Sequence, residues 1–111
     1  MKTEFIVVLV TVSDESLGTM IARSLVEEGL AACVNIVPGL RSIYVFGGEL
    51  CDDAEVLCVI KTRAERFDEL AERISTLHPY DVPEIISLSL QSGNASYLRW
   101  VREATASSSE T

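Results

Sequence analysis

The chain has 111 residues, of which 48% are hydrophobic, so we expect one globular domain with an apolar core and not a disordered chain. Nine basic residues stand against 17 acidic ones, which gives a net charge of −8. No cluster of lysine or arginine occurs, and this argues against nucleic-acid binding. The acidic balance favours a surface that attracts cations or basic partners, although solubility alone also explains it.

The first element is a near-continuous β-branched run over residues 5–12, which predicts a strand in the interior of a sheet. Ser13 stands where a helix N-cap is expected, and apolar residues then recur at helical spacing. Gly29 follows at the position of a C′ glycine, so the pattern predicts a helix of roughly 15 residues. The same apolar run is too short for a signal peptide or a membrane span, and we expect a cytoplasmic protein without a membrane partner.

The middle of the chain predicts a long strand pair. Residues 30–46 are strand-like but are interrupted at Pro38-Gly39, where a bulge, bend or edge position is expected because proline lacks a backbone donor. Gly47-Gly48 is a hairpin turn signal, and residues 55–62 return as a strand. The pair is longer than its neighbours, so its tip must project. Apolar side chains on a projecting tip favour oligomerisation by strand pairing.

The second half of the chain predicts two helices around a short strand. Thr62 and Glu65 match a capping box for a helix that ends at His78-Pro79, with Glu69 and Arg73 as an i,i+4 ion pair. Its predicted apolar face consists of Phe67, Leu70, Ala71, Ile74 and Leu77. Residues 85–90 predict a strand, and Asn94 is expected to cap a last helix that points Leu98 and Val101 inward.

The order β-α-β-β-α-β with an extra C-terminal helix predicts an α+β fold, the ferredoxin-like sandwich with both main helices on one face of an antiparallel sheet. We expect residues 1–104 to form a single domain. The Ser/Thr/Glu-rich residues 105–111 are expected to be a frayed tail.

The segment from His78 to Glu84 is the most unusual in the chain. Its two prolines, Pro79 and Pro83, hold His78, Tyr80, Asp81 and Glu84 in few orientations, and histidine and glutamate are ligands for transition metals. The alternative is a rigid helix-to-strand turn in which His78 caps the last carbonyls of the helix. The sequence alone leaves both open.

Cys33 and Lys61 also have two interpretations each. Cys33 lies in a β-branched stretch and is either a small buried hydrophobe or a soft metal ligand that needs a donor such as His78 nearby. Lys61 closes a strand, where it either projects into a cleft or lies along the surface. Cys33, Cys51 and Cys58 lack CxxC spacing, so we expect free thiols. No catalytic motif occurs, and we expect a protein that is not an enzyme.

Five blocks of sequence together resemble the CutA family over nearly all of residues 4–102. They are Ala31-Ala32-Cys33-Val34-Asn35, Pro38-Gly39-x-x-Ser42-x-Tyr44, Ile60-Lys61-Thr62, His78-Pro79-Tyr80-x-x-Pro83-Glu84 and Gly93-Asn94-x-x-Tyr97-Leu98-x-Trp100. The resemblance implies a ferredoxin-like domain in a tight homotrimer, and a cytoplasmic location in bacteria. It also implies a role in divalent-cation tolerance, with copper or another divalent metal ion bound by some members and no obligatory cofactor.

The resemblance further implies a site at the clefts between subunits. The matching positions are His78, Glu84 and Cys33 as metal ligands, with Tyr44, Lys61 and Tyr80 lining the cleft. The chain departs from the family at Phe46, where tryptophan is common, and at Val10, where some members carry a cysteine proposed as a ligand. Two other functions remain open: a small-molecule sensor like the PII signalling proteins, and a structural trimer without a ligand. The short, acidic loop at residues 47–52 argues against the sensor, because phosphate binding favours basic or glycine-rich loops.

Overall fold

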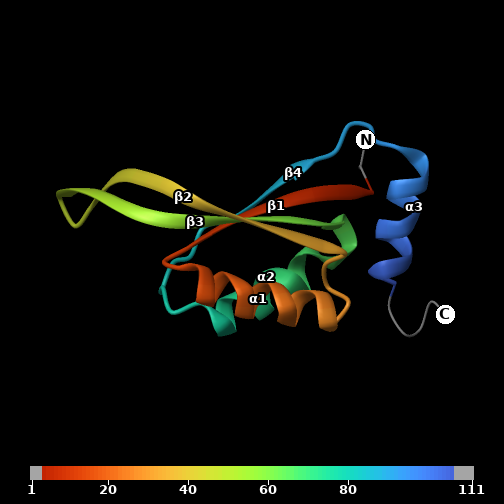
Figure 1. The fold of residues 1–111 in the computed structure, drawn as a ribbon, viewed down its shortest axis with the longest axis horizontal. Helices are drawn as coiled ribbons and strands as arrows, with labels where there is room; N and C mark the ends of the chain where they lie inside the picture. The colour runs from red at the N-terminus through yellow and green to blue at the C-terminus, as the bar shows by residue number, and fades with distance from the viewer. Residues whose placement is uncertain (1–3, 107–111) are drawn as a thin grey trace.

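The computed structural model describes residues 4–106 and shows four strands, three α-helices and one 3₁₀ turn (Figure 1). In chain order these are β1 (Phe5–Val12), α1 (Glu15–Glu27), β2 (Cys33–Phe46), β3 (Glu49–Arg63), the 3₁₀ turn (Ala64–Arg66), α2 (Phe67–Leu77), β4 (Ile85–Ser89) and α3 (Ala95–Ala104). The strands form one antiparallel sheet in the order β2-β3-β1-β4. The predicted α+β class and element order are confirmed.

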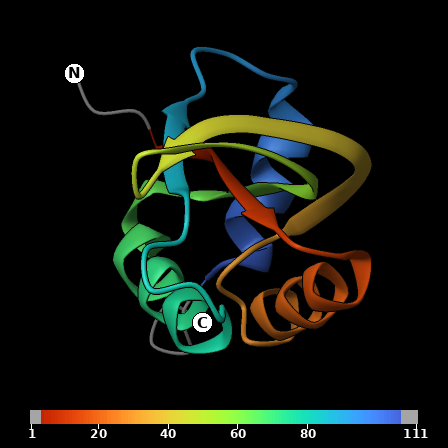
Figure 2. The ribbon, with the colours of Figure 1, turned by 90° about the vertical axis from the view of Figure 1, so that its left-hand side faces the viewer.

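The core lies between one face of the sheet and the helices α1 and α2. These helices lie side by side on that face, while α3 stands at the end of the sheet where β1 begins (Figures 1 and 2). β1 is central because it pairs with both β3 and β4, and its alternate residues Val8, Val10 and Val12 are fully buried. Helix residues that complete this core are Ile21, Leu25, Leu70 and Ile74.

The strand pair β2-β3 projects well beyond the rest of the sheet, as predicted (Figure 1). β3 has 15 residues against 8 in β1, and its pairing with β1 stops at Val56, so residues 49–55 pair with β2 alone. β3 therefore begins at Glu49, six residues before Glu55, where the sequence predicted the start of this strand. The register shifts between Val37 and Leu40, which confirms the bulge at Pro38-Gly39, and Gly47 and Gly48 turn the chain with positive φ angles of 60° and 80°.

Two predicted helix starts are wrong, and the structure shows why. Asp14, not Ser13, caps α1: its Oδ1 accepts the Leu17 N–H at 2.8 Å. Thr62 does not open α2 but stays in β3, fully buried, where its Oγ1 donates to the Leu30 carbonyl at 2.7 Å. Pairing with β1 extends the strand past Thr62, and this tertiary contact overrides the local capping signal.

The predicted Glu69–Arg73 pair is also replaced by contacts with other partners. Arg73 binds Glu28 beyond the end of α1 at 2.9 Å, and Glu69 binds Arg66 at 3.0 Å. At the other end of the chain, Asn94 caps α3 and Val101 is buried, both as predicted. Thr105 is fully buried, so the frayed tail does not begin there, and residues 107–111 lie outside the described part.

Candidate functional site

A groove of about 960 Å³ lies between the projecting hairpin and the segment that joins α2 to β4. The hairpin contributes Tyr44, Phe46, Glu49, Cys51 and Glu55 to its lining, and the joining segment contributes Tyr80, Asp81 and Glu84. Among the described residues, no lysine or arginine lines the groove. Four carboxylates and three aromatic rings share this concave surface with the apolar Ile43 and Val82, and the carboxylates suit a positively charged ligand.

His78 does not line the groove but contacts two residues that do, Thr11 and Tyr80, and it is only 5% exposed. Its Nε2 lies 2.8 Å from the Thr11 carbonyl oxygen, and because a carbonyl only accepts, Nε2 carries the proton. Nδ1 is then the acceptor for the Tyr80 N–H at 3.2 Å, and the two rings lie 4.6 Å apart. Both ring nitrogens are thus engaged, so a metal ion would have to displace one of these bonds.

We expect His78→Ala to lower the free energy of unfolding by about 1–3 kcal/mol in metal-free buffer, because the Thr11 carbonyl and the Tyr80 N–H both lose a partner. Urea denaturation in the presence of a chelator measures this. Glu72→Ala, on the exposed side of α2, is the control and should change stability by less than about 0.5 kcal/mol. A His78→Ala protein of unchanged stability would contradict the structural role of the ring.

Two tyrosine hydroxyls near the groove donate to carboxylates of β3. Tyr80 donates to Glu55 Oε2 at 3.3 Å, and Tyr44 donates to Asp53. Burial, followed by the charge of Glu55, raises the pKa of Tyr80. The hydrogen bond to Asp53 is the largest cause that raises the pKa of Tyr44 above its ordinary range. Both phenols therefore stay neutral at physiological pH and present fixed oxygens beside the groove.

Asp53→Asn should lower the pKa of Tyr44 toward the ordinary value of about 10, because ionised Tyr44 would no longer stand beside a negative charge. A titration to alkaline pH, followed by the absorbance of tyrosinate, measures this change in pKa. Asp52→Asn is the matched control, since Asp52 binds Arg41 and not a tyrosine. Identical titration curves for wild type and Asp53→Asn would contradict the contact.

Cys33 and Lys61 do not join this groove within one chain. They face each other across β2 and β3, and Lys61 also pairs with Val7 near the start of β1, whereas His78 contacts Thr11 near its end. Lys61 donates to Asn35 Oδ1. Of the predicted residues, the structure thus brings together Glu84, Tyr44 and Tyr80 at the groove, and His78 contacts Tyr80. No group of three or more His, Cys, Asp or Glu side chains within residues 4–106 is arranged to hold a metal ion.

Glu49 and Glu55 are groove residues that the sequence analysis missed. In a strand, alternate side chains share a face, and Glu49, Cys51, Asp53 and Glu55 follow that period of two. The signal was present, but residues 47–52 were expected to form a short acidic loop, whereas β3 already begins at Glu49. Glu55 is only 9% exposed, which makes it the most buried carboxylate among the described groove residues.

The fold and the groove define a class: a small α+β protein with two helices on one sheet face, a projecting hairpin and a carboxylate-lined groove. The family model described as "CutA1 divalent ion tolerance protein" matches residues 6–104. The chain belongs to this CutA family. The resemblance of the five sequence blocks to this family is therefore confirmed.

Relatives support the assignment in both sequence and structure. "Divalent-cation tolerance protein CutA" of Thermus thermophilus is 54% identical over 99 residues, which cover 89% of this chain and 96% of that protein. "Protein CutA 1, chloroplastic" of rice is 48% identical over 93% of this chain, but the chain spans only 58% of the rice protein. The solved Thermus structure aligns with a TM-score of 0.90 at 53% identity, covering 92% of this chain and 99% of that one.

The names of the relatives place them in different compartments. The rice protein is chloroplastic, and a solved structure from Archaeoglobus fulgidus, 29% identical with a TM-score of 0.90 over 92% of this chain and 99% of that one, is called periplasmic. Within residues 4–106, none of the helices is both long and apolar enough to cross a membrane. A cytoplasmic location thus stays a prediction for this chain.

Proposed function

We propose that this protein is a homotrimer that binds copper or a similar divalent cation as part of tolerance to metal stress. The observation that carries the proposal is the groove, where Glu49, Glu55, Asp81 and Glu84 line one concave surface without a described basic residue. Oxygen ligands of this kind bind divalent cations, and the names of the relatives link them to divalent-cation tolerance. Because no three of these side chains converge within residues 4–106 of one chain, the proposed site takes its remaining ligands from water or from a second subunit. The acidic surface of the chain would raise the local cation concentration further.

Within this proposal the predicted ligands have different roles. Of the three predicted ligands, Glu84 alone is exposed and lines the groove, so it is the best placed to bind a cation there. His78 would join only if Nδ1 released the Tyr80 N–H. Cys33 lies toward the other end of the sheet, so it would contribute to a cation site only through a second chain or at a separate place.

The homotrimer is supported by apolar surface that one chain leaves uncovered. Ile43, Val45, Phe46 and Leu50 on the hairpin are 64–75% exposed, and Ile86 and Leu88 on the sheet face opposite α1 and α2 are 50% and 55% exposed. A single small domain rarely leaves so many large apolar residues in water unless another chain covers them. We propose a binding role without catalysis, in the cytoplasm.

Calorimetric titration with Cu²⁺ tests the cation site. Asp81→Asn with Glu84→Gln should weaken binding about tenfold or more, because two candidate ligand charges are lost. Asp68→Asn with Glu72→Gln removes the same charge from the exposed side of α2 and should leave the isotherm unchanged. If both double variants weakened binding equally, the effect would come from the net charge of the protein and not from the groove. Identical isotherms for the wild type and both double variants would refute the groove as the site.

A further inference from the structure

Glu55 is the only buried carboxylate among residues 4–106, and it lines the groove. Its polar contact within that part of the chain is a long hydrogen bond, in which the Tyr80 hydroxyl donates to Oε2 at 3.3 Å. No basic side chain of the described residues forms an ion pair with it. Carboxylates are rarely buried unless a cation pairs with them, so Glu55 calls for a cation from outside these residues.

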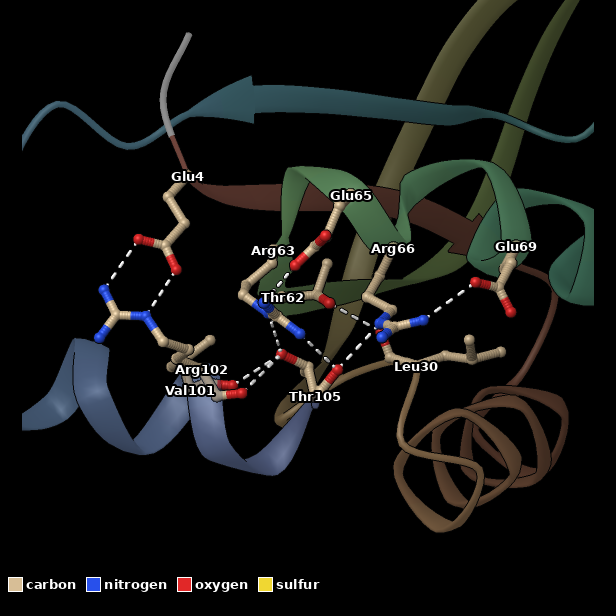
Figure 3. A network of polar contacts seen from close by, with 10 residues as sticks. All are labelled: Glu4, Leu30, Thr62, Arg63, Glu65, Arg66, Glu69, Val101, Arg102 and Thr105. Carbon is tan, nitrogen blue, oxygen red and sulfur yellow. Dashed lines mark hydrogen bonds and ion pairs between the residues drawn. The ribbon is translucent and has the colours of Figure 1, made fainter. Parts of the chain in front are cut away.

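The exposed carboxylates of the chain show the opposite behaviour. Five of them bind an arginine although their side chains are 40–64% exposed: Glu4, Glu28, Asp52, Glu65 and Glu69. Three of these pairs surround the C-terminal end of α3, where Arg63, Arg66 and Arg102 are the partners (Figure 3). The hairpin lies at the other end of the sheet (Figure 1). The shortage of positive charge is therefore local to the groove.

The carboxylates of the groove are spread along its length. Glu49 and Glu55 lie six positions apart on β3, and a strand rises about 3.3 Å per residue, so their backbones are about 20 Å apart. Asp81 and Glu84 come from the opposite wall, the segment that joins α2 to β4. A divalent cation holds its oxygen ligands within about 2.6 Å, so one ion cannot neutralise both ends of the groove. Separate charges of this kind suit a ligand whose positive charges are spaced along a chain.

The surface between the carboxylates suits the apolar part of such a ligand. The rings of Tyr44, Phe46 and Tyr80 line the groove, and ring faces attract ammonium groups while also packing against methylene groups. The Tyr80 oxygen, whose hydrogen is directed to Glu55, keeps lone pairs that accept from an ammonium group with three donors. The volume of about 960 Å³ is within the range of about 300–1,000 Å³ that is typical of small-molecule sites.

We propose that the groove binds a linear aliphatic polyamine. One ammonium group is held by Glu55 and the Tyr80 oxygen, the methylene segments lie on the aromatic rings, and the remaining ammonium groups pair with Glu49, Asp81 and Glu84. The inference rests on the proposed function because both use this groove. Copper would use the carboxylate oxygens as ligands, whereas the polyamine uses the spacing of the carboxylates and the rings between them.

Calorimetric titration of the full chain with spermine, a linear tetramine, tests the site at fixed ionic strength. Glu55→Gln should weaken binding about tenfold or more, because the buried charge that holds one ammonium group is lost. The amide keeps the size of the side chain and an acceptor for Tyr80, and Glu55→Asp, which keeps the charge but draws it back, should bind with intermediate affinity. Glu72→Gln removes the same charge from the exposed side of α2 and should change the affinity by less than about twofold.

A shorter amine and copper supply the remaining comparisons. 1,4-Diaminobutane should bind more weakly than spermine, because it reaches fewer of the separate carboxylates; equal affinities would overturn the proposal. Equal weakening by Glu55→Gln and Glu72→Gln would also overturn it, since attraction would then come from net charge alone. Wild-type protein that binds Cu²⁺ but not spermine would overturn the polyamine site and leave the proposed function intact. Binding of spermine without Cu²⁺ would support the polyamine site and refute the metal site.

Discussion

Arg63→Met should lower the free energy of unfolding by about 2–4 kcal/mol at fixed chain concentration. The methionine keeps much of the buried volume but removes the guanidinium that donates twice to Thr105 and pairs with Glu65. Hydrogen bonds to a charged group contribute about 1.5–3 kcal/mol each, and burial of the apolar methionine side chain offsets part of the loss of the two bonds to Thr105. Chemical denaturation followed by circular dichroism measures the change.

Arg41→Met is the matched control for this prediction. Arg41 binds Asp52 on the hairpin, but its side chain is 71% exposed, so its loss should cost less than about 1 kcal/mol. Arg63→Lys should recover only part of the loss, because an ammonium lacks the planar fork that reaches the hydroxyl and the carbonyl together. Equal effects of Arg63→Met and Arg41→Met would show that burial of the guanidinium does not decide its contribution.

The second large effect concerns assembly. Val45→Lys with Phe46→Lys should convert the proposed trimer, with three times the 12.2 kDa mass of one chain, into single chains in sedimentation equilibrium. Neighbouring residues of a strand point to opposite faces, so the pair places a charge on whichever face of the hairpin is covered. Val45 and Phe46 are 69% and 64% exposed in one chain, so the fold of the domain itself should survive.

Met20→Lys with Val26→Lys is the control for assembly. These α1 residues are 40% and 44% exposed, so the substitution adds the same charge to apolar surface far from the hairpin. Its mass should equal that of the wild type. A hairpin variant that keeps the wild-type mass would contradict assembly through the hairpin, and a wild type that sediments as one chain would contradict the trimer.

Local rules predicted most of the elements, and they failed where a distant segment competed. The β-branched run of β1, the glycine after α1 and the Asn94 cap depend on neighbours in sequence, and all three are confirmed. Thr62 matched a capping box just as well, but pairing with β1 and a hydrogen bond to Leu30, 32 positions away, keep it in β3. Local capping energies of about 1 kcal/mol are too small to outweigh such burial.

The candidate site was predicted only in part. The prolines around residues 78–84 pointed to a segment that lines the groove, because their restriction of the backbone is local. The partner of His78 is Thr11, 67 positions away, and the partner of Tyr80 is Glu55, so neither contact leaves a signal near the segment itself. The separation of Cys33 from Glu84 follows from strand register, which the sequence left open.

The sequence by itself determined the order of the elements, the projecting hairpin and membership of the CutA family, since these depend on local periodicity and on motifs along the chain. Tertiary structure alone decided that Arg63 is buried against Thr105, that Glu55 faces Tyr80, and that α3 packs outside the main core. The physical reason is that a long-range contact depends on how separate elements pack and pair. The free energy of burying a charge or a ring depends on those neighbours and not on the residues beside it in sequence.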